Sequence, residues 1–192
     1  MARTREFDRD IALDRALRLF WLKGYDSTSM QNLVDETGVN RASMYATFGN
    51  KHALFQAALD RYNELVETDF LAPLKGTGPA RQRIEAFLQG MIESQISGEH
   101  PACLMIKSSL AVNPGSQETR DQINRFIKSV DDAFLHTVKD AQAGGEIAPE
   151  RNADEVARYL TYTMQALIVS AAMRQSQATT EAHLNNALKA LD

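Results

Sequence analysis

Polar and cationic side chains of the kinds that bind nucleic acids occur together between residues 28 and 51. Arg41 offers paired N–H donors that match guanine O6 and N7, and Ser43 can bond to several base edges. Lys51 and Tyr45 suit phosphate or sugar groups, and Thr28 suits a phosphate while it caps a helix. Three further residues carry methyl groups that can contact thymine. The candidate DNA contacts are therefore Thr28, Arg41, Ala42, Ser43, Tyr45, Ala46, Thr47 and Lys51.

Each of these assignments has a plainer alternative. Arg41 could be a solvated surface charge, and Tyr45 could fill the core, although Met44 and Phe48 already supply that face. Arg3 and Arg5 could contact phosphates or the minor groove from an N-terminal arm, or could be idle charges of a chain terminus.

Cys103 is the only cysteine and the only candidate nucleophile that we single out. His100 or Lys107 could lower its pKa, as a redox sensor or an enzymatic thiol would require. The alternative is a buried apolar residue, which is usual for a lone cysteine in a helix. The four histidines show no metal-ligand spacing, and no glycine-rich phosphate loop is present. We therefore expect no metal and no cofactor.

The elements that must position these residues are all helical, because apolar residues recur at three- and four-residue spacing throughout. Four helices are expected in the N-terminal part, over residues 8–23, 28–38, 41–48 and 51–70. Thr28 or Ser29, Asn40 and Asn50 are suitable N-caps, and Gly24 and Gly38 are suitable helix ends. Two short helices joined by a tight turn predict a helix-turn-helix whose last helix can enter a DNA major groove. Its inward positions are Leu33, Val34, Val39, Met44 and Phe48.

Residues 8–56 closely resemble the TetR family of transcriptional regulators. The resemblance is carried by Leu19-Phe20, Gly24-Tyr25, Thr28-Ser29-Met30, Gly38-Val39, Tyr45, Phe48, Lys51 and Leu54. It implies a helix-turn-helix DNA-binding domain over residues 1–56 and a helical ligand-binding and dimerisation domain over residues 57–192. It also implies a DNA contact by Tyr45. The expected protein is a ligand-responsive homodimeric repressor, which a small-molecule effector releases from a palindromic double-stranded DNA operator.

The C-terminal part predicts further helices over residues 80–97, 102–112, 116–143, 153–175 and 180–191, for eight to ten helices in all. The last two carry more apolar residues than one small core needs, so we expect them to pair with a second copy. These residues are Val156, Tyr159, Leu160, Thr163, Met164, Leu167, Ile168, Ala171, Leu184, Ala187, Leu188 and Leu191. The alternative is a purely intramolecular core.

An apolar set with a few polar groups lies between these two regions, which is the composition of a small-molecule pocket. Its candidate residues are Met91, Gln95, Cys103, Met105, Ser108, Phe126, Val130, Phe134 and Met164. For each one taken singly, ordinary helix core is the alternative.

Charge distribution and apolar runs indicate which classes of protein the chain can belong to. Residues 1–52 carry a net charge of +1 and residues 53–192 a net charge of −5, which hints at different partners. No apolar run is long enough to span a bilayer, and the first residues show no secretory signal, so a cytoplasmic protein is expected. Two other classes stay open: an enzyme with Cys103 as nucleophile, and a helical interaction module that has lost DNA binding.

Overall fold

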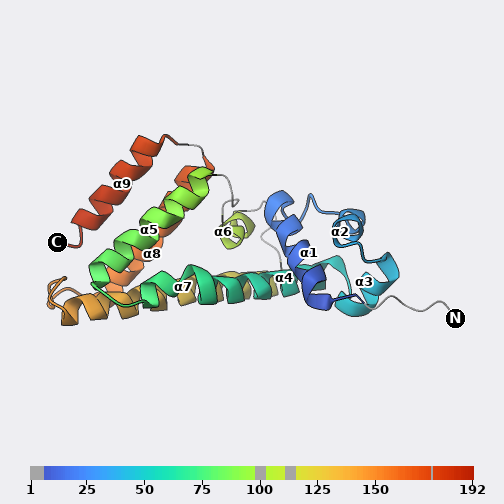
Figure 1. Ribbon diagram of the computed structural model, residues 1–192, viewed down its shortest axis with the longest axis horizontal. Helices are drawn as coiled ribbons and strands as arrows, with labels where there is room; N and C mark the ends of the chain where they lie inside the picture. Colours follow the sequence, from blue (N-terminus) through green and yellow to red (C-terminus); the bar gives the residue numbers. More distant parts are fainter. Residues whose placement is uncertain (1–6, 98–102, 111–115, 174) are drawn as a thin grey trace.

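The computed structural model describes residues 7–97, 103–110, 116–173 and 175–192, with the backbone alone for 95–97. These residues form α1 (Arg9–Lys23), α2 (Met30–Thr37), α3 (Arg41–Phe48), α4 (Lys51–Leu65), η1 (Val66–Phe70), η2 (Ala72–Lys75), α5 (Ala80–Ser97), α6 (Leu104–Ser109), α7 (Gln117–Ala143), α8 (Ala153–Ala172) and α9 (Gln177–Lys189). The segment η1 is a π-helical turn and η2 is a 3-10 helix. No β-strand occurs in these ranges, so the all-α prediction is confirmed. Figure 1 shows α1–α3 at one end of the molecule and α9 at the other.

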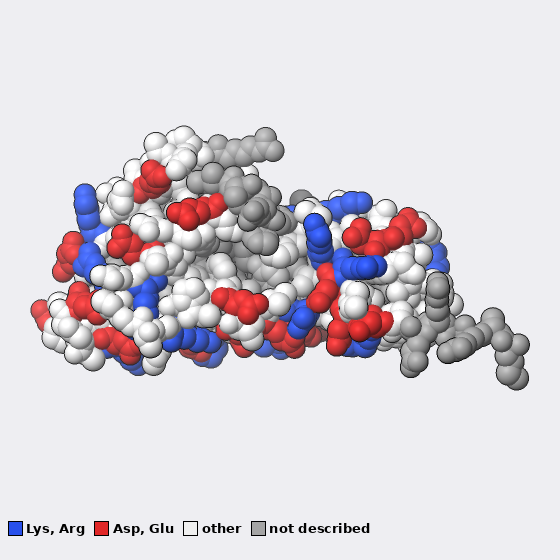
Figure 2. Space-filling view, in the orientation of Figure 1, with Lys and Arg blue, Asp and Glu red and all other residues white. Residues whose placement is uncertain are grey.

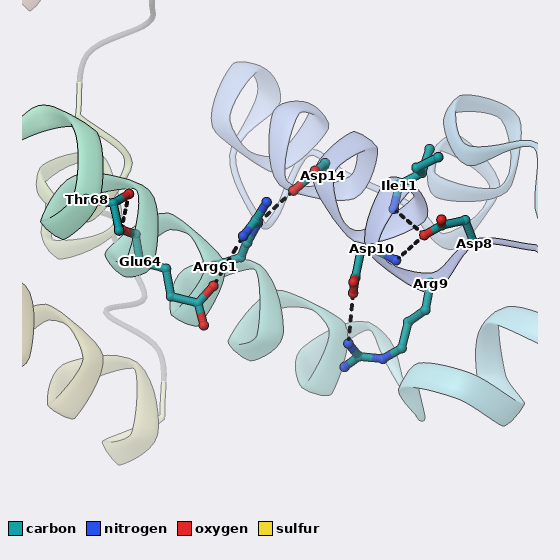
Figure 3. Close-up of polar contacts among 8 residues, drawn as sticks. All are labelled: Asp8, Arg9, Asp10, Ile11, Asp14, Arg61, Glu64 and Thr68. Carbon is teal, nitrogen blue, oxygen red and sulfur yellow. Dashed lines mark hydrogen bonds and ion pairs between the residues drawn. The ribbon is translucent and has the colours of Figure 1, made fainter.

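The first helix is fixed at its start and tied to α4. The Asp8 carboxylate accepts hydrogen bonds from the backbone N–H groups of Asp10 and Ile11, at 2.9 and 3.1 Å. These bonds satisfy donors that the helix itself leaves without partners. Arg61 of α4 donates to Asp14 of α1 at 2.9 Å (Figure 3). The helix thus begins at a defined residue and presents its apolar face to α4.

The fourth helix belongs to both halves of the molecule. It begins beside α3, continues through η1 and packs along α7. The predicted boundary after residue 56 falls inside α4, so the two units share this helix. The helix expected over residues 51–70 keeps its length, but its last turn, Val66–Phe70, is π-helical.

The C-terminal half is a helical bundle in which α5, α7, α8 and α9 pack together (Figure 1). The short helix α6 packs on α7, and Lys107 of α6 donates a hydrogen bond to the Trp21 carbonyl of α1. Arg83 of α5 joins its parts: it donates to the carbonyl oxygens of Leu74 and Gly76, at 2.6 and 3.0 Å, and forms a 2.7 Å ion pair with Asp140 of α7. Among the described residues, no helix combines the length and the apolar character that a bilayer crossing requires.

Candidate DNA interface and ligand cavity

Local signals in the sequence set the ends of the two short helices. The Ser29 hydroxyl accepts from the Asn32 N–H at 3.1 Å, and the Asn32 side-chain oxygen accepts from the Ser29 N–H at 3.0 Å. This reciprocal capping box starts α2. Gly38 ends it with φ 72°, a left-handed conformation that only glycine adopts without strain. The Asn40 side chain then accepts from the Ser43 N–H at 2.9 Å and starts α3.

The inner face of α3 packs against α2, as the helix-turn-helix interpretation expects. Leu33, Val39, Met44 and Phe48 are buried, whereas Val34 is only half-buried. The predicted inward set is therefore confirmed except that Val34 lies at its margin. Since these side chains hold α3 from one side, its opposite side stays open.

That opposite side carries the candidate base contacts. Tyr45 has 45% of its surface exposed, which excludes the core-filler alternative. Arg41 is exposed and Ser43 is half-buried. The remaining exposed positions of this face are Ala42, Ala46 and Thr47. These small residues and one tyrosine form a narrow, partly polar surface of the shape that a major groove admits.

Lys51 stands at the first residue of α4, where the helix N-terminus itself carries partial positive charge. Its ammonium lies 4.2 Å from the centre of the Tyr25 ring, within cation–π range. Tyr25 in turn packs on Phe55, with ring centres 4.8 Å apart. Burial, with a further effect of Asp26, raises the pKa of Tyr25, so the phenol stays neutral beneath the cation. The geometry suits a phosphate contact.

Thr28 does not have the position that its predicted role needs. Its side chain is 1% exposed and its hydroxyl donates to the Gly24 carbonyl at 2.7 Å. The exposed Ser29 caps α2 instead. The hydroxyl of Thr28 is therefore turned into the fold, because it satisfies the end of α1 rather than the start of α2.

Two exposed residues near α3 were not among the DNA contacts predicted from the sequence. Arg9 places its guanidinium 5.4 Å from the centre of the Phe48 ring, next to the end of α3, and Figure 3 shows it beside Asp10. Gln31 of α2 accepts a hydrogen bond from Arg41 at 3.1 Å. Neither could be found from motif spacing, because both contacts depend on how α1 and α2 pack on α3. Figure 2 shows blue and red side chains intermixed on the visible face of this end of the molecule.

A cavity of about 500 Å³ lies where α1 and α4 meet the C-terminal bundle. Its lining comes from α1, α4, η1, η2, α5, the start of α6, α7 and α8: Trp21, Tyr62, Leu65, Val66, Asp69, Phe70, Pro73, Ala86, Phe87, Gly90, Met91, Ser94, Cys103, Phe126 and Ile168. Its size is that of a small-molecule site.

Aromatic pairs build the walls of this cavity. Trp21 and Tyr62 meet edge to face with ring centres 5.2 Å apart, and Phe70 and Phe87 do the same at 4.9 Å. Edge-to-face pairs of this kind contribute stability beyond that of their buried area. Trp21 contributes to this wall from the N-terminal unit, so the cavity borders both units of the chain.

Cys103 lies in the cavity wall, and its surroundings do not activate it. The Tyr62 hydroxyl donates to its sulfur at 3.3 Å, but burial raises the pKa of the thiol nevertheless. Lys107 points elsewhere: its ammonium donates to the Trp21 carbonyl at 2.7 Å. His100 lies outside the described residues. The thiol stays protonated at neutral pH, which argues against a redox sensor or a nucleophile.

The predicted pocket set is only partly at the cavity. Met91, Cys103 and Phe126 line it. Four other predicted residues are buried but do not line the cavity. Val130, Phe134 and Met164 belong to the core, and Met105 lines a different, outer groove together with Phe126. Ser108 is half-buried and lines neither, and the side chain of Gln95 lies outside the described residues.

The outer groove, about 510 Å³, runs between α6, α7 and α8 and includes Leu110, Tyr162, Val169 and Met173. Tyr159 and Tyr162 are exposed on α8, and Met173 is exposed just beyond its end. Most residues predicted to pair with a second copy are instead buried within the chain: Val156, Leu160, Thr163, Met164, Leu167, Ile168, Leu184, Ala187, Leu188 and Leu191. Their burial is what the intramolecular alternative expects, because α8 packs on α5, α7 and α9, and α9 packs on α5 and α8.

Comparison with known proteins agrees with this architecture. The family model "Bacterial regulatory proteins, tetR family" matches residues 12–58, and "Tetracyclin repressor-like, C-terminal domain" matches residues 80–187. The chain belongs to the TetR family of bacterial regulatory proteins. The uncharacterized HTH-type transcriptional regulator YezE of Bacillus subtilis (strain 168) is 30% identical over 100% of both chains. The HTH-type transcriptional repressor ComR of Escherichia coli (strain K12) is 32% identical, over 88% of this chain and 81% of ComR.

Solved structures lead to the same family. A cysteine mutant of the TetR family transcriptional regulator CifR, complexed with 26-bp double-strand operator DNA, is 29% identical over 100% of both chains, with a TM-score of 0.87. TetR family members are DNA-binding transcriptional regulators and not enzymes, so the enzymatic alternative built on Cys103 is wrong.

Proposed function

We propose that this TetR family regulator is a homodimeric repressor that leaves a palindromic operator when a small-molecule effector occupies the cavity. The observation that carries the proposal is Trp21: it belongs to the helix that packs against the DNA-binding helices, yet its ring forms part of the cavity wall. One bound molecule would therefore contact both halves of the chain.

The open face of α3 enters the major groove in this proposal. Arg41 and Ser43 meet base edges, and Ala42, Ala46 and Thr47 contact thymine methyl groups. Tyr45 and Lys51 bind phosphates on either side and fix the register of the helix. The buried hydroxyl of Thr28 is left out of this set. The operator complex of CifR and the repressor role in the name of ComR support DNA binding and repression.

A second copy of the chain covers the outer face of α8. Tyr159, Tyr162, Val169 and Met173 are separated by three, seven and four residues, so they lie on one face of the helix and its end. Exposed aromatic and methionine side chains of this density are typical of interfaces. In this dimer, two copies of α3 related by a twofold axis would read half-sites about one DNA turn, roughly 34–36 Å, apart, so the operator is palindromic.

Lys107 links the cavity to the DNA-binding unit. Its ammonium donates to the last carbonyl groups of α1, those of Trp21 and Leu22, at 2.7 and 3.4 Å. Burial lowers the pKa of this amine, which is held at a helix C-terminus where cations are favoured. Four residues before it, Cys103 begins α6 from the cavity wall. An effector that binds one arrangement of Cys103 and Trp21 more tightly than the other shifts α6 and α1 together.

Selection of bound duplexes from a random DNA pool tests the proposal. We expect a palindrome whose half-sites are centred about 10 base pairs, or a multiple of this, apart. Repeating the selected titration with a library of small molecules then identifies those that release the duplex. A chain that retains no duplex at low salt, while still forming dimers, would support the interaction-module alternative instead.

A further inference from the structure

A short chain of hydrogen bonds joins α2 to the first residue of α3. The Arg41 guanidinium donates from Nη2 to Gln31 Oε1 at 3.1 Å. The Gln31 amide nitrogen Nε2 donates to Asp35 Oδ1 at 2.8 Å. All three side chains are exposed, so none of them contributes to the core. An interaction among exposed side chains beside a DNA-reading face needs an explanation other than packing.

We propose that Gln31 is a positioning residue for Arg41, which holds the guanidinium in the orientation that reads a base. The inference rests on the proposed operator recognition and adds a residue to it. A carboxylate can only accept hydrogen bonds, so Asp35 requires the donor end of the Gln31 amide to face it. The oxygen of that amide then faces Arg41, and its orientation is no longer free to reverse.

The arrangement leaves Arg41 able to bind DNA. A guanidinium has five N–H donors, and the Gln31 oxygen uses one of them. A pair of parallel donors remains for guanine O6 and N7. A free arginine side chain must give up rotamer freedom when it binds, and an arginine already held loses less. Gln31 thus improves affinity without touching a base.

The neutral amide also keeps the acidic group at a distance. Within the described ranges, neither Arg41 nor Asp35 forms an ion pair. A direct carboxylate partner would occupy two donors of Arg41 and would compete with the guanine. Asp35 instead acts through Gln31, so its negative charge orients the amide while the charge of Arg41 stays uncompensated.

The test compares full-length variants on the selected operator and on an unrelated duplex by fluorescence anisotropy. Gln31→Ala is expected to weaken operator binding roughly three- to tenfold, which lies in the lower part of the range of couplings between contacting residues. Binding to the unrelated duplex and its salt dependence should stay unchanged, because no phosphate contact is lost. In an Arg41→Ala background the same change should have no further effect. Asp35→Asn should weaken binding, because an amide partner no longer dictates which end of Gln31 faces Arg41. The loss should be smaller than for Gln31→Ala, because the Gln31 side chain is still present.

Glu36→Gln is the matched control, because it removes a carboxylate from the residue that follows Asp35 in α2. Glu36 is exposed and has no partner among the described residues, so this change should not weaken binding. Equal losses from Gln31→Ala with and without Arg41 would mean that Gln31 contacts DNA itself, and would overturn the inference. Unchanged operator affinity would overturn it as well, while leaving the proposed function standing. A wild-type chain that selects no duplex would overturn the proposed function and this inference with it.

Discussion

Replacing Gly90 with leucine should fill the cavity and stabilise the protein at the same time. Gly90 lies within the length of α5 and is exposed at the open side of the cavity that it lines, and a Cβ atom built on it meets nothing within 4 Å. The new side chain would therefore enter open space. Loss of ligand binding together with a gain in stability is a result that misfolding cannot produce.

The gain can be estimated from two effects. Glycine in a helix interior costs about 0.8–1 kcal/mol relative to alanine, and Gly90→Ala recovers this amount. Leucine adds the burial of its remaining carbons, part of the roughly 1.5–3 kcal/mol that full burial would give, because the cavity is open to solvent. We expect Gly90→Leu to raise the free energy of unfolding by about 1–2 kcal/mol, or the melting temperature by roughly 2–8 °C.

Urea unfolding and Nile red fluorescence measure the two consequences. The dye, an uncharged apolar probe, should bind the wild type and the Gly90→Ala control. It should bind Gly90→Leu about five- to 150-fold more weakly, because overlap with the added carbons costs about 1–3 kcal/mol. Operator binding should be retained, since Gly90 is remote from α3 in the fold. A destabilised Gly90→Leu, or dye binding equal to that of the wild type, would refute this account of the cavity.

Three further changes test other parts of the structure. Asp8→Ala removes the cap of α1 and should lower the free energy of unfolding by about 1 kcal/mol in urea titrations; an unchanged midpoint would contradict that role. Tyr162→Arg places a charge on the outer face of α8 and should give monomers in sedimentation velocity, whereas a persistent dimer would place the interface elsewhere. Burial raises the pKa values of Cys103 and Tyr62, so the contribution of these two groups to stability should be constant below the ordinary thiol value near pH 8.5. This contribution should fall above that pH, because the unfolded chain releases protons that the folded chain keeps. A Cys103→Ala and Tyr62→Phe double variant should therefore lose less stability between pH 8.5 and 11, and an equally steep loss would be evidence against this prediction.

Capping residues in the sequence were sufficient to predict where α2 ends and where α3 and α4 begin. Asn40, Gly38 and Asn50 act through backbone groups within a few residues of themselves, so their effects can be predicted without knowing the fold. The same holds for α5, whose bounds, Ala80–Ser97, coincide with the predicted ones. The choice between Thr28 and Ser29 as cap could not be made, because it depends on whether Gly24 offers its carbonyl to Thr28.

The cavity could be predicted as a kind of site but not in its lining. Helical periodicity identifies the inward face, and Val130 and Phe134 are indeed inward. It does not tell which inward side chains border a space and which pack on neighbours. Trp21 and Phe87 line the same cavity although α1 and α5 are far apart in the sequence, so only the folded chain shows that they share it. Of the exposed residues on α8, Tyr159 was in the set predicted to pair with a second copy but Tyr162 was not, because only the packed bundle shows which side of an apolar helix remains uncovered.

The most direct test of the account is the salt dependence of operator binding for Lys51→Ala and Tyr45→Ala. Lys51 is held at a helix N-terminus above Tyr25, and Tyr45 is exposed on α3, so both should contact the DNA backbone. We predict weaker binding for each variant. For Lys51→Ala, the slope of log affinity against log salt should also become shallower by about one unit, as one phosphate contact is lost. Unchanged affinity and an unchanged slope would contradict the claim that this face of the molecule binds DNA.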